Sequence, residues 1–208
     1  MWNENRSSAV MTGTGVRLES PLVGAQSLLD ASLAQQSKLF RLRERPFLEL
    51  VNVRGDARDG AIAAAVHSVI GTPLPTTPNT VSRGSEYEAL WLGPDEWLVR
   101  PNEARTPELE GKMRTALGAL FASVVDVGSG YTVLEASGER VRDVISRGCP
   151  LDLHPKMLQC GQCAQSHFFK ASIVLIPTSD DTFEIIVRRS FADYFCRILL
   201  DAAAPIVS

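Results

Sequence analysis

Apolar residues recur along this chain with two alternating periods. Residues 47–53, with the sequence Phe-Leu-Glu-Leu-Val-Asn-Val, have the apolar composition of a strand. The segment 62–70 then carries apolar residues at helical spacing, and Gly71 ends it, which predicts an amphipathic helix. We expect Gly55-Asp56 to form the turn and the helix cap between the two.

The pattern next predicts a hairpin and a second helix. Residues 71–85 are rich in Pro, Thr and Ser and indicate a loop with a short edge strand. Residues 87–92 and 96–100 flank Gly93-Pro94-Asp95, with Trp91 and Trp97 expected to pack across the strands. Thr106 is the expected cap of the following helix, with Pro107 at its first position. The apolar stripe expected on that helix is Leu109, Met113, Ala116, Leu117, Leu120 and Phe121.

The same order of elements then returns. A strand over 131–136 leads into a helix that carries Val141, Val144 and Ile145. Two strands, 168–176 and 183–188, follow across a turn over 177–181. Ser190-Phe-Ala-Asp193 has the form of a capping box and predicts a last helix. The residues expected to be buried by that helix are Phe191, Tyr194, Phe195, Ile198 and Leu199.

This repeated order predicts an α+β fold with antiparallel sheet, built from two ferredoxin-like halves. We expect one globular unit over residues 21–208, with halves of about 21–123 and 124–208. Each half alone would leave one face of its sheet bare, so we expect the halves to pack against each other. Residues 1–20 are polar and rich in Gly, Ser and Thr, which indicates an extended arm.

Composition narrows the function by exclusion. The chain has 208 residues, a net charge of -3 and 45% hydrophobic residues, which is ordinary for a globular protein. No basic excess favours nucleic acid or an anionic membrane as partner. No apolar run approaches the roughly 18 residues that span a bilayer. The first residues do not form a secretory signal, so we expect a cytoplasmic protein.

Four cysteines offer candidate chemistry: Cys149, Cys160, Cys163 and Cys196. Cys160 and Cys163 have the spacing of a zinc knuckle, and His154 and His167 could complete a ligand set. The spacings of these histidines match no familiar zinc module. We favour buried thiols that act as small hydrophobic groups.

Other polar residues have a structural and a chemical interpretation. Asp126 could be a carboxylate with a raised pKa in an apolar setting, but we favour a turn residue that accepts backbone N–H groups. Asp152 and His154 could form an acid–base pair, but Pro150 and Pro155 favour a shaped loop. Gly128-Ser-Gly130 lacks the third glycine of a nucleotide loop and indicates a turn.

Basic residues also allow two interpretations. Arg41, Arg43 and Arg45 form either a solvated face or a contact for an acidic partner, and His67 lies on the polar side of its helix. No nucleophile, base and anion hole come together in the pattern. We therefore predict no catalytic, cofactor-binding or metal-binding residue on this chain.

The segment 147–156 is the most distinctive. Gly148 can take a left-handed cap conformation, and Pro150 forbids continuation of the helix. Together with other short segments, it resembles the gamma subunits of heterotetrameric sarcosine oxidases over residues 20–200. The segments that carry the resemblance are Ser20-Pro-Leu22, Leu92-Gly-Pro-Asp-Glu-Trp-Leu-Val99, Val125-Asp-Val127, Gly148-Cys-Pro-Leu-Asp-Leu-His-Pro155, Cys163-Ala-Gln165 and Val187-Arg-Arg-Ser-Phe-Ala192.

The resemblance implies a reduced form of the folate-binding aminomethyltransferase (T-protein) fold, to which residues 124–133 are similar. It also implies a complex that oxidises sarcosine to glycine and hydrogen peroxide. The methyl carbon leaves as formaldehyde or as methylene-tetrahydrofolate. The implied partners are the alpha, beta and delta subunits, with alpha as the main contact. The implied cofactors FAD, FMN, NAD, tetrahydrofolate and zinc belong to those subunits.

One departure bears on activity. The resemblance to T-proteins implies a catalytic aspartate just before the second-half hairpin, yet residues 164–176 contain no carboxylate. We therefore expect a structural subunit of the complex. The alternatives are a free-standing folate-binding or aminomethyl-transferring protein and a zinc module that uses Cys160 and Cys163.

Overall fold

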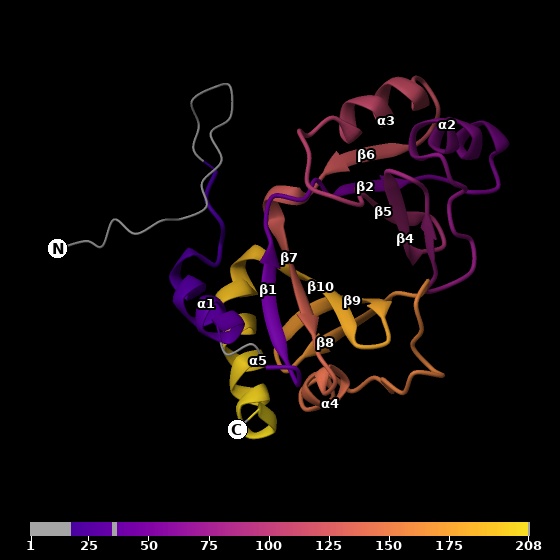
Figure 1. The fold of residues 1–208 in the computed structure, drawn as a ribbon. Coiled ribbons are helices and arrows are strands. Elements are labelled where there is room, and N and C mark those ends of the chain that lie inside the picture. Colours follow the sequence, from indigo (N-terminus) through magenta and orange to yellow (C-terminus); the bar gives the residue numbers. More distant parts are fainter. Residues whose placement is uncertain (1–17, 35–36, 208) are drawn as a thin grey trace.

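The fold consists of two five-stranded antiparallel sheets stacked face to face, each covered by helices on its outer side (Figure 1). This computed structural model describes residues 18–34 and 37–207. The expected arm over residues 1–20 therefore lies almost wholly outside the described residues. The α+β class with antiparallel sheet is confirmed.

The first sheet has the strand order β3-β4-β5-β2-β6. Its strands are β2 (Val51–Arg54), β3 (Val81–Arg83), β4 (Tyr87–Gly93), β5 (Glu96–Pro101) and β6 (Ser123–Asp126). Helices α2 (Gly60–Ile70) and α3 (Leu109–Leu117) cover its outer face. Val51, Val53, Trp97 and Val99 point into this core from the sheet, and Ile62, Val66, Ile70, Leu109, Met113 and Leu117 point into it from the helices.

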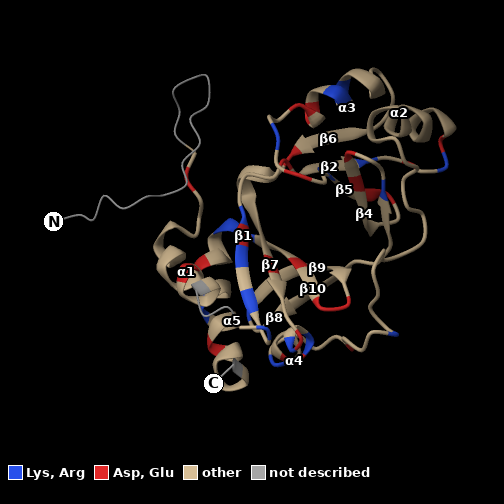
Figure 2. Cartoon of the chain, viewed as in Figure 1, with Lys and Arg blue, Asp and Glu red and all other residues tan. Residues whose placement is uncertain are grey.

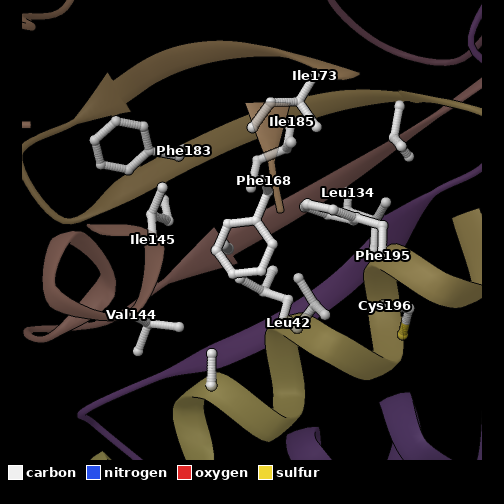
Figure 3. Close-up of a cluster of buried hydrophobic side chains, with 14 of the residues drawn as sticks. Leu42, Leu134, Val144, Ile145, Phe168, Ile173, Phe183, Ile185, Phe195 and Cys196 are labelled. Atoms are coloured by element: carbon white, nitrogen blue, oxygen red, sulfur yellow. The ribbon is translucent and has the colours of Figure 1, made fainter. Parts of the chain in front are cut away.

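The second sheet has the order β1-β7-β10-β9-β8. Its strands are β1 (Arg41–Arg45), β7 (Tyr131–Ser137), β8 (Ala164–Phe168), β9 (Ala171–Ser179) and β10 (Thr182–Arg188). Helices α1 (Gln26–Ala34), α4 (Val141–Ser146) and α5 (Ala192–Val207) form its outer layer, with short 3-10 turns at Val23–Ala25, Gly128–Gly130 and Arg189–Phe191. Figure 3 shows Phe168, Phe183 and Phe195 in the core between this sheet and its helices.

The inner faces of the two sheets make a third core. Leu48 and Leu50 precede β2 and face this layer, whereas Val51 and Val53 face the helices, as strand alternation requires. The other buried members of the inner layer are Leu90, Leu98, Val133, Cys163, Ile176 and Ile186. The expectation that the two bare faces would bury each other is met by this layer.

Strand pairing crosses the boundary expected near residue 123. β1 precedes the first sheet in the chain but pairs with β7 of the second, Leu42 opposite Ala136. β6 follows α3 and pairs with β2 of the first sheet, Val53 opposite Val124. Each sheet thus takes a strand from across the crossover, which ties the two halves together. The division into halves itself stays a prediction.

Three predicted aromatic positions are wrong. Phe121 is 99% exposed because α3 already ends at Leu117. Phe191 and Tyr194 are exposed at the start of α5, where their rings meet edge to face with centroids 6.4 Å apart. Helical spacing predicted all three on an apolar stripe. Phe121 lies beyond the end of α3, and the packing of α5 does not cover Phe191 and Tyr194.

Two predicted helix caps are also wrong. Asp59, rather than Gly55-Asp56, caps α2 by accepting the Ala61 N–H at 2.8 Å. The N-cap position of α3 is Glu108, not Thr106, and no local side chain caps it. The carboxylate of Glu49 accepts the N–H groups of residues 108, 109 and 110, each at 3.0 Å. A cap supplied from so far away in the chain leaves no local signal.

The expected strand over 168–176 is two strands. Residues Phe169 and Lys170 make a turn between β8 and β9, with Phe169 at a φ of 48°. β9 then runs on to Ser179, so the turn before β10 is Asp180-Asp181 rather than 177–181. Gly148 does not adopt a left-handed conformation, because its φ is not positive. Its close approach to aromatic rings explains the residue instead.

Candidate functional site

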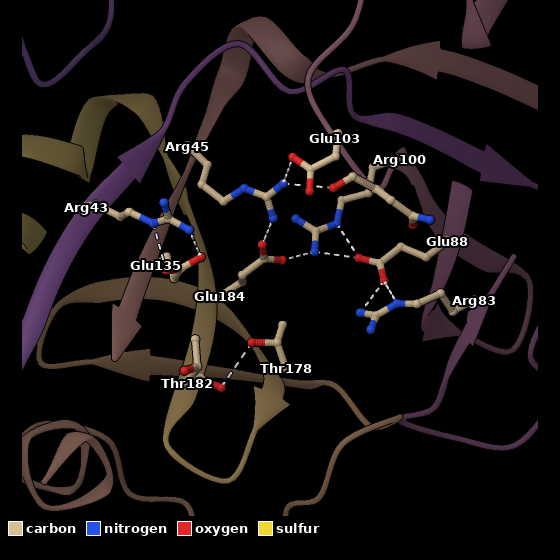
Figure 4. A network of polar contacts seen from close by, with 11 residues as sticks. Arg43, Arg45, Arg83, Glu88, Arg100, Glu103, Glu135, Thr178, Thr182 and Glu184 are labelled. Carbon is tan, nitrogen blue, oxygen red and sulfur yellow. Dashed lines mark hydrogen bonds and ion pairs between the residues drawn. The ribbon is translucent and has the colours of Figure 1, made fainter. Parts of the chain in front are cut away.

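The most unusual group of side chains is a buried ionic network between the two sheets (Figure 4). Arg100 on β5 lies between Glu88 on β4 and Glu184 on β10, and these three side chains are 2%, 2% and 3% exposed. The Arg100 Nε donates to Glu88 Oε1 at 2.7 Å, and Arg100 Nη2 pairs with Glu184. The network therefore joins the first sheet to the second.

Arginines at the rim complete the pairing of the two buried carboxylates. Arg45 pairs with Glu184 and donates to the Asn102 carbonyl at 2.8 Å, and Arg83 pairs with Glu88 at 2.6 Å. The buried carboxylates of Glu88 and Glu184 thus each contact two guanidinium groups. Buried charges are tolerated when they are paired and hydrogen-bonded in this way. The network ties the two sheets together and holds both buried carboxylates in ion pairs, while Arg100 Nη1 has no hydrogen-bond partner among the described residues.

The three arginines of β1 lie on the same face of the strand but differ in their surroundings. Arg41 and Arg43 are exposed, as a solvated face requires, and Arg43 pairs with Glu135 at 2.7 Å. Arg45 instead turns inward to the network, so for this residue the expected solvated or partner-facing role is wrong. Figure 2 shows these basic positions alternating along β1.

Charge pairing sets the acidity of Glu88. Burial raises the pKa of this carboxyl. The charges of Arg100 and Arg83 and their hydrogen bonds lower it by more than that, so the net pKa lies below its usual 4.5. Burial also lowers the pKa of Arg100, against the opposing effect of Glu88. A carboxylate held ionised by two cations is a poor proton carrier at neutral pH, and this points to a structural role.

The distinctive 147–156 segment packs against the β8–β9 turn. A Cβ on Gly148 would lie 2.7 Å from the Phe169 ring and 2.8 Å from the Phe168 ring, which only glycine avoids. Asp152 accepts the backbone N–H of His154 at 2.9 Å, and His154 Nδ1 accepts that of Lys156 at 3.2 Å. Both side chains shape their own loop, and they do not form an acid–base pair with each other.

The cysteines occupy different environments. Cys149, Cys163 and Cys196 are buried and Cys160 is exposed, and none of them is bonded to another. Burial raises the pKa of Cys163 to about 11 and that of Cys196 to about 12. Within residues 18–34 and 37–207, no group of three His, Cys, Asp or Glu side chains is arranged to hold a metal ion. Buried thiols of this kind behave as small hydrophobic groups.

The Cys163-Ala-Gln165 motif links the edges of the two sheets. The Cys163 N–H donates to the Asn79 carbonyl at 2.9 Å, and its thiol contacts the Trp91 carbonyl at 3.4 Å. Gln165 Nε2 donates to the Leu92 carbonyl at 2.7 Å, at the end of β4. The motif therefore holds β8 against the β4–β5 hairpin.

The remaining candidates are local features. Asp126 accepts the Gly128 N–H at 2.8 Å, which confirms the turn interpretation. Trp91 and Trp97 face each other across the hairpin, as expected, and His67 is exposed. Among the described helices, none has the length and apolar character needed to cross a membrane.

The sequence did not point to Arg100, Glu88 and Glu184 of the network or to the Glu49 cap. Each of these four is a charged residue in an otherwise apolar segment, as in Tyr87-Glu-Ala-Leu90 and Phe183-Glu-Ile-Ile186. That placement is the one signal that could have marked them, since charged side chains are rarely fully buried unless paired. Their partners lie in other strands and could not be read from local pattern.

Comparison with known proteins gives a consistent assignment. Residues 54–205 match the model of the sarcosine oxidase, gamma subunit family. The chain is 33% identical over 205 residues to sarcosine oxidase subunit gamma of Corynebacterium sp. (strain P-1), with 97% of each chain covered. It is 33% identical over 171 residues to the subunit of the same name from Arthrobacter sp., with 80% of this chain and 81% of that one covered.

Solved structures agree with the fold. A chain of heterotetrameric sarcosine oxidase from Corynebacterium sp. U-96, in complex with pyrrole 2-carboxylate, matches with a TM-score of 0.83 and 25% identity over 92% of this chain and 97% of that one. Glycine cleavage system aminomethyltransferase T from Bartonella henselae matches with a TM-score of 0.60 and 14% identity. That match covers 93% of this chain but 53% of the other, so it shows a shortened version of the same fold. The chain belongs to the sarcosine oxidase gamma subunit family.

Proposed function

We propose that this chain is a non-catalytic structural subunit of a heterotetrameric sarcosine oxidase. The complex would oxidatively demethylate sarcosine to glycine, hydrogen peroxide and either formaldehyde or methylene-tetrahydrofolate. The observation that carries the proposal is the full-length correspondence with a chain of such a heterotetramer, at a TM-score of 0.83 over 97% of that chain.

The use made of the polar residues supports a non-catalytic role. The buried carboxylates of Glu49, Glu88 and Glu184 are engaged in caps and ion pairs. The exposed candidates, Asp126 and the Asp152–His154 pair, serve local turns. Residues 168–172, which form the β8–β9 turn and the start of β9, contain no carboxylate that could perform aminomethyl transfer.

The chemistry then belongs to the companion subunits. Flavin oxidation, with FAD and FMN, and the binding of NAD, tetrahydrofolate and zinc would reside on alpha, beta and delta. The alpha subunit is the expected main contact of this chain, in the cytoplasm. The role left for this chain is to supply folded surface that holds the assembly, and permanent interfaces of this type bury on the order of 2,000 Å² or more.

Co-purification from the native cell tests this proposal. A tagged full-length chain should bring down three further polypeptides together with sarcosine-dependent oxygen consumption. The isolated chain, titrated with tetrahydrofolate in a calorimeter, should give no heat of binding. Micromolar folate binding by a chain that purifies alone would instead support the free-standing folate protein and exclude the structural subunit.

A further inference from the structure

A groove lies at one end of the first sheet, where several connections between its strands and helices meet. It has a volume of about 1050 Å³ and is lined by the β4–β5 turn, the loop after β2 and the approach to β6. Trp91 and Pro94 line it from the hairpin, and Leu120 and Phe121 line it from the segment before β6. Aromatic and aliphatic groups in a concave site are typical of binding surfaces.

Phe121 is the most exposed large apolar side chain in the described chain, at 99%. Hydrogen bonds on both sides hold the turn that presents it, from Leu120 N–H to the Leu117 carbonyl at 2.9 Å and from Ala122 N–H to the Leu120 carbonyl at 2.8 Å. Exposure of an aromatic ring to water is unfavourable, and a partner that buried the ring would gain this hydrophobic free energy. Exposed aromatic anchors of this kind dominate protein interfaces.

The charges of the groove are unequal. Arg54 pairs with Glu96 at 2.8 Å and Arg58 with Asp56 at 2.9 Å, so both cations are neutralised. Asp59 and Asp95 also line the groove, and no ion pair to either is found in residues 18–34 and 37–207. The groove is therefore net acidic, and a basic side chain on the occupant would complement it.

The strand next to the groove is a short edge strand, and Arg114 of α3 donates to its Val124 carbonyl at 2.7 Å. β6 is the outermost strand of its sheet and pairs with β2 alone. Its sequence, Ser123-Val-Val-Asp126, has neither the lysine nor the proline that commonly guards an edge, and Val125 is exposed. Because the Val124 carbonyl is already used, an occupant of the groove would be held by side-chain contacts rather than by pairing along this edge.

We propose that this groove, defined by Trp91, Pro94, Asp95, Leu120 and Phe121, docks an extended segment of another subunit of the complex. The segment would place an apolar side chain against Trp91 and Phe121 and a lysine or arginine beside Asp95 and Asp59. This inference rests on the proposed function, because it requires companion chains.

The test co-expresses the tagged full-length chain with its three companion subunits. The variant Phe121→Asp should lower the yield of co-purified subunits by about tenfold or more, since loss of one aromatic anchor commonly costs that much. Met157→Asp is the matched control, because Met157 is also exposed, at 61%, but lies outside the groove. The control should co-purify its companions as the wild-type chain does.

Two further measurements sharpen the test. Phe121→Ala and Phe121→Asp should unfold at the wild-type midpoint, so that lost assembly reports a lost contact rather than a lost fold. Asp95→Lys should also weaken assembly, most strongly at low ionic strength. Wild-type yield from Phe121→Asp, or equal losses from Phe121→Asp and Met157→Asp, overturns the docking site. Failure of the wild-type chain to co-purify would count against the proposed function itself.

Discussion

The neighbours of Gly148 explain why this position excludes a side chain. The residue follows α4, and its carbonyl accepts the Phe169 N–H at 2.9 Å, which draws the backbone onto two aromatic rings. Phe168 is fully buried against Phe195, with ring centroids 5.6 Å apart, so it cannot withdraw. A methyl group at this position would have to displace the core of the second sheet.

We therefore expect Gly148→Ala to lower the free energy of unfolding by about 1–3 kcal/mol through overpacking. Gly111→Ala is the control, because Gly111 lies in α3 with open space around its Cα. That exchange should instead stabilise the chain by about 0.5–1 kcal/mol. Urea unfolding measures both, and equal stability of the two variants would contradict the steric account.

Glu88 makes stability depend on acid. Its pKa is lowered from 4.5 in the folded chain, because Arg100 and Arg83 outweigh the effect of burial. The unfolded chain then binds the proton more readily, so stability falls as the pH drops below about 4.5 and through the lowered pKa. Above about pH 4.5, the pKa of the unfolded chain, the ionised Glu88 makes its full contribution to stability.

The difference in unfolding free energy between wild type and Glu88→Gln should accordingly be constant from about pH 5 to 7 and shrink at lower pH. Denaturant melts across this range measure it. A difference that grew on acidification would mean that the folded-state pKa of Glu88 is raised.

At the scale of elements, the start of α3 depends on a residue from before β2. Glu49 is buried, and its two carboxylate oxygens satisfy three N–H groups that the first turn of a helix leaves free. Its negative charge also faces the positive end of the helix dipole. The cap couples the position of α3 to the first sheet.

Glu49→Ala should cost about 1–3 kcal/mol of unfolding free energy, because buried N–H donors lose their acceptor. Glu49→Gln retains one oxygen acceptor and should cost less. Hydrogen exchange of the amides of residues 108–110 should accelerate in the alanine variant ahead of the rest of α3. Unchanged protection there would show that Glu49 does not hold the helix start.

Elements with a strong internal period could be predicted from the sequence, and elements set by distant partners could not. The helix α2 and the β4–β5 hairpin carry their own apolar period and turn residues. β1, with the sequence Arg-Leu-Arg-Glu-Arg, has one apolar residue and is a strand because β7 pairs with it. β6 is likewise a short edge strand, and its pairing with β2 is non-local.

On the scale of the whole molecule, the buried network is a charged connection between the stacked sheets. Arg100 comes from the first sheet and Glu184 from the second, with apolar side chains of both sheets around them. Removing one partner of a buried pair leaves an uncompensated charge, which destabilises the fold more than replacing the whole pair by apolar residues would. The fit of the two sheets therefore depends on Arg100.

Arg100→Met should lower the unfolding free energy by about 3–5 kcal/mol, since Glu88 and Glu184 would stay buried with less compensation. Arg83→Met is the matched control, because Arg83 contacts the same Glu88 but is 52% exposed. Its loss should cost about 1 kcal/mol or less. Comparable losses of unfolding free energy for the two variants would mean that burial does not increase the contribution of the Arg100 ion pairs.

The sequence led to the family through short loop motifs, whose roles the structure explains in part. Gly148 and Cys163 hold close contacts between elements, which local pattern could not show. The network at Arg100 could not be predicted either, because its charges meet only after the sheets stack. That this chain has no catalytic residues stays a proposal, which activity measurements on the chain alone and on the complex can test.

Oxygen uptake with sarcosine tests that central claim most directly. The purified chain alone, at full length and correctly folded by circular dichroism, should consume no oxygen and show no flavin absorbance. The same chain purified with its three companions should show both. Sarcosine-dependent oxygen uptake or bound flavin in the isolated chain would contradict the account.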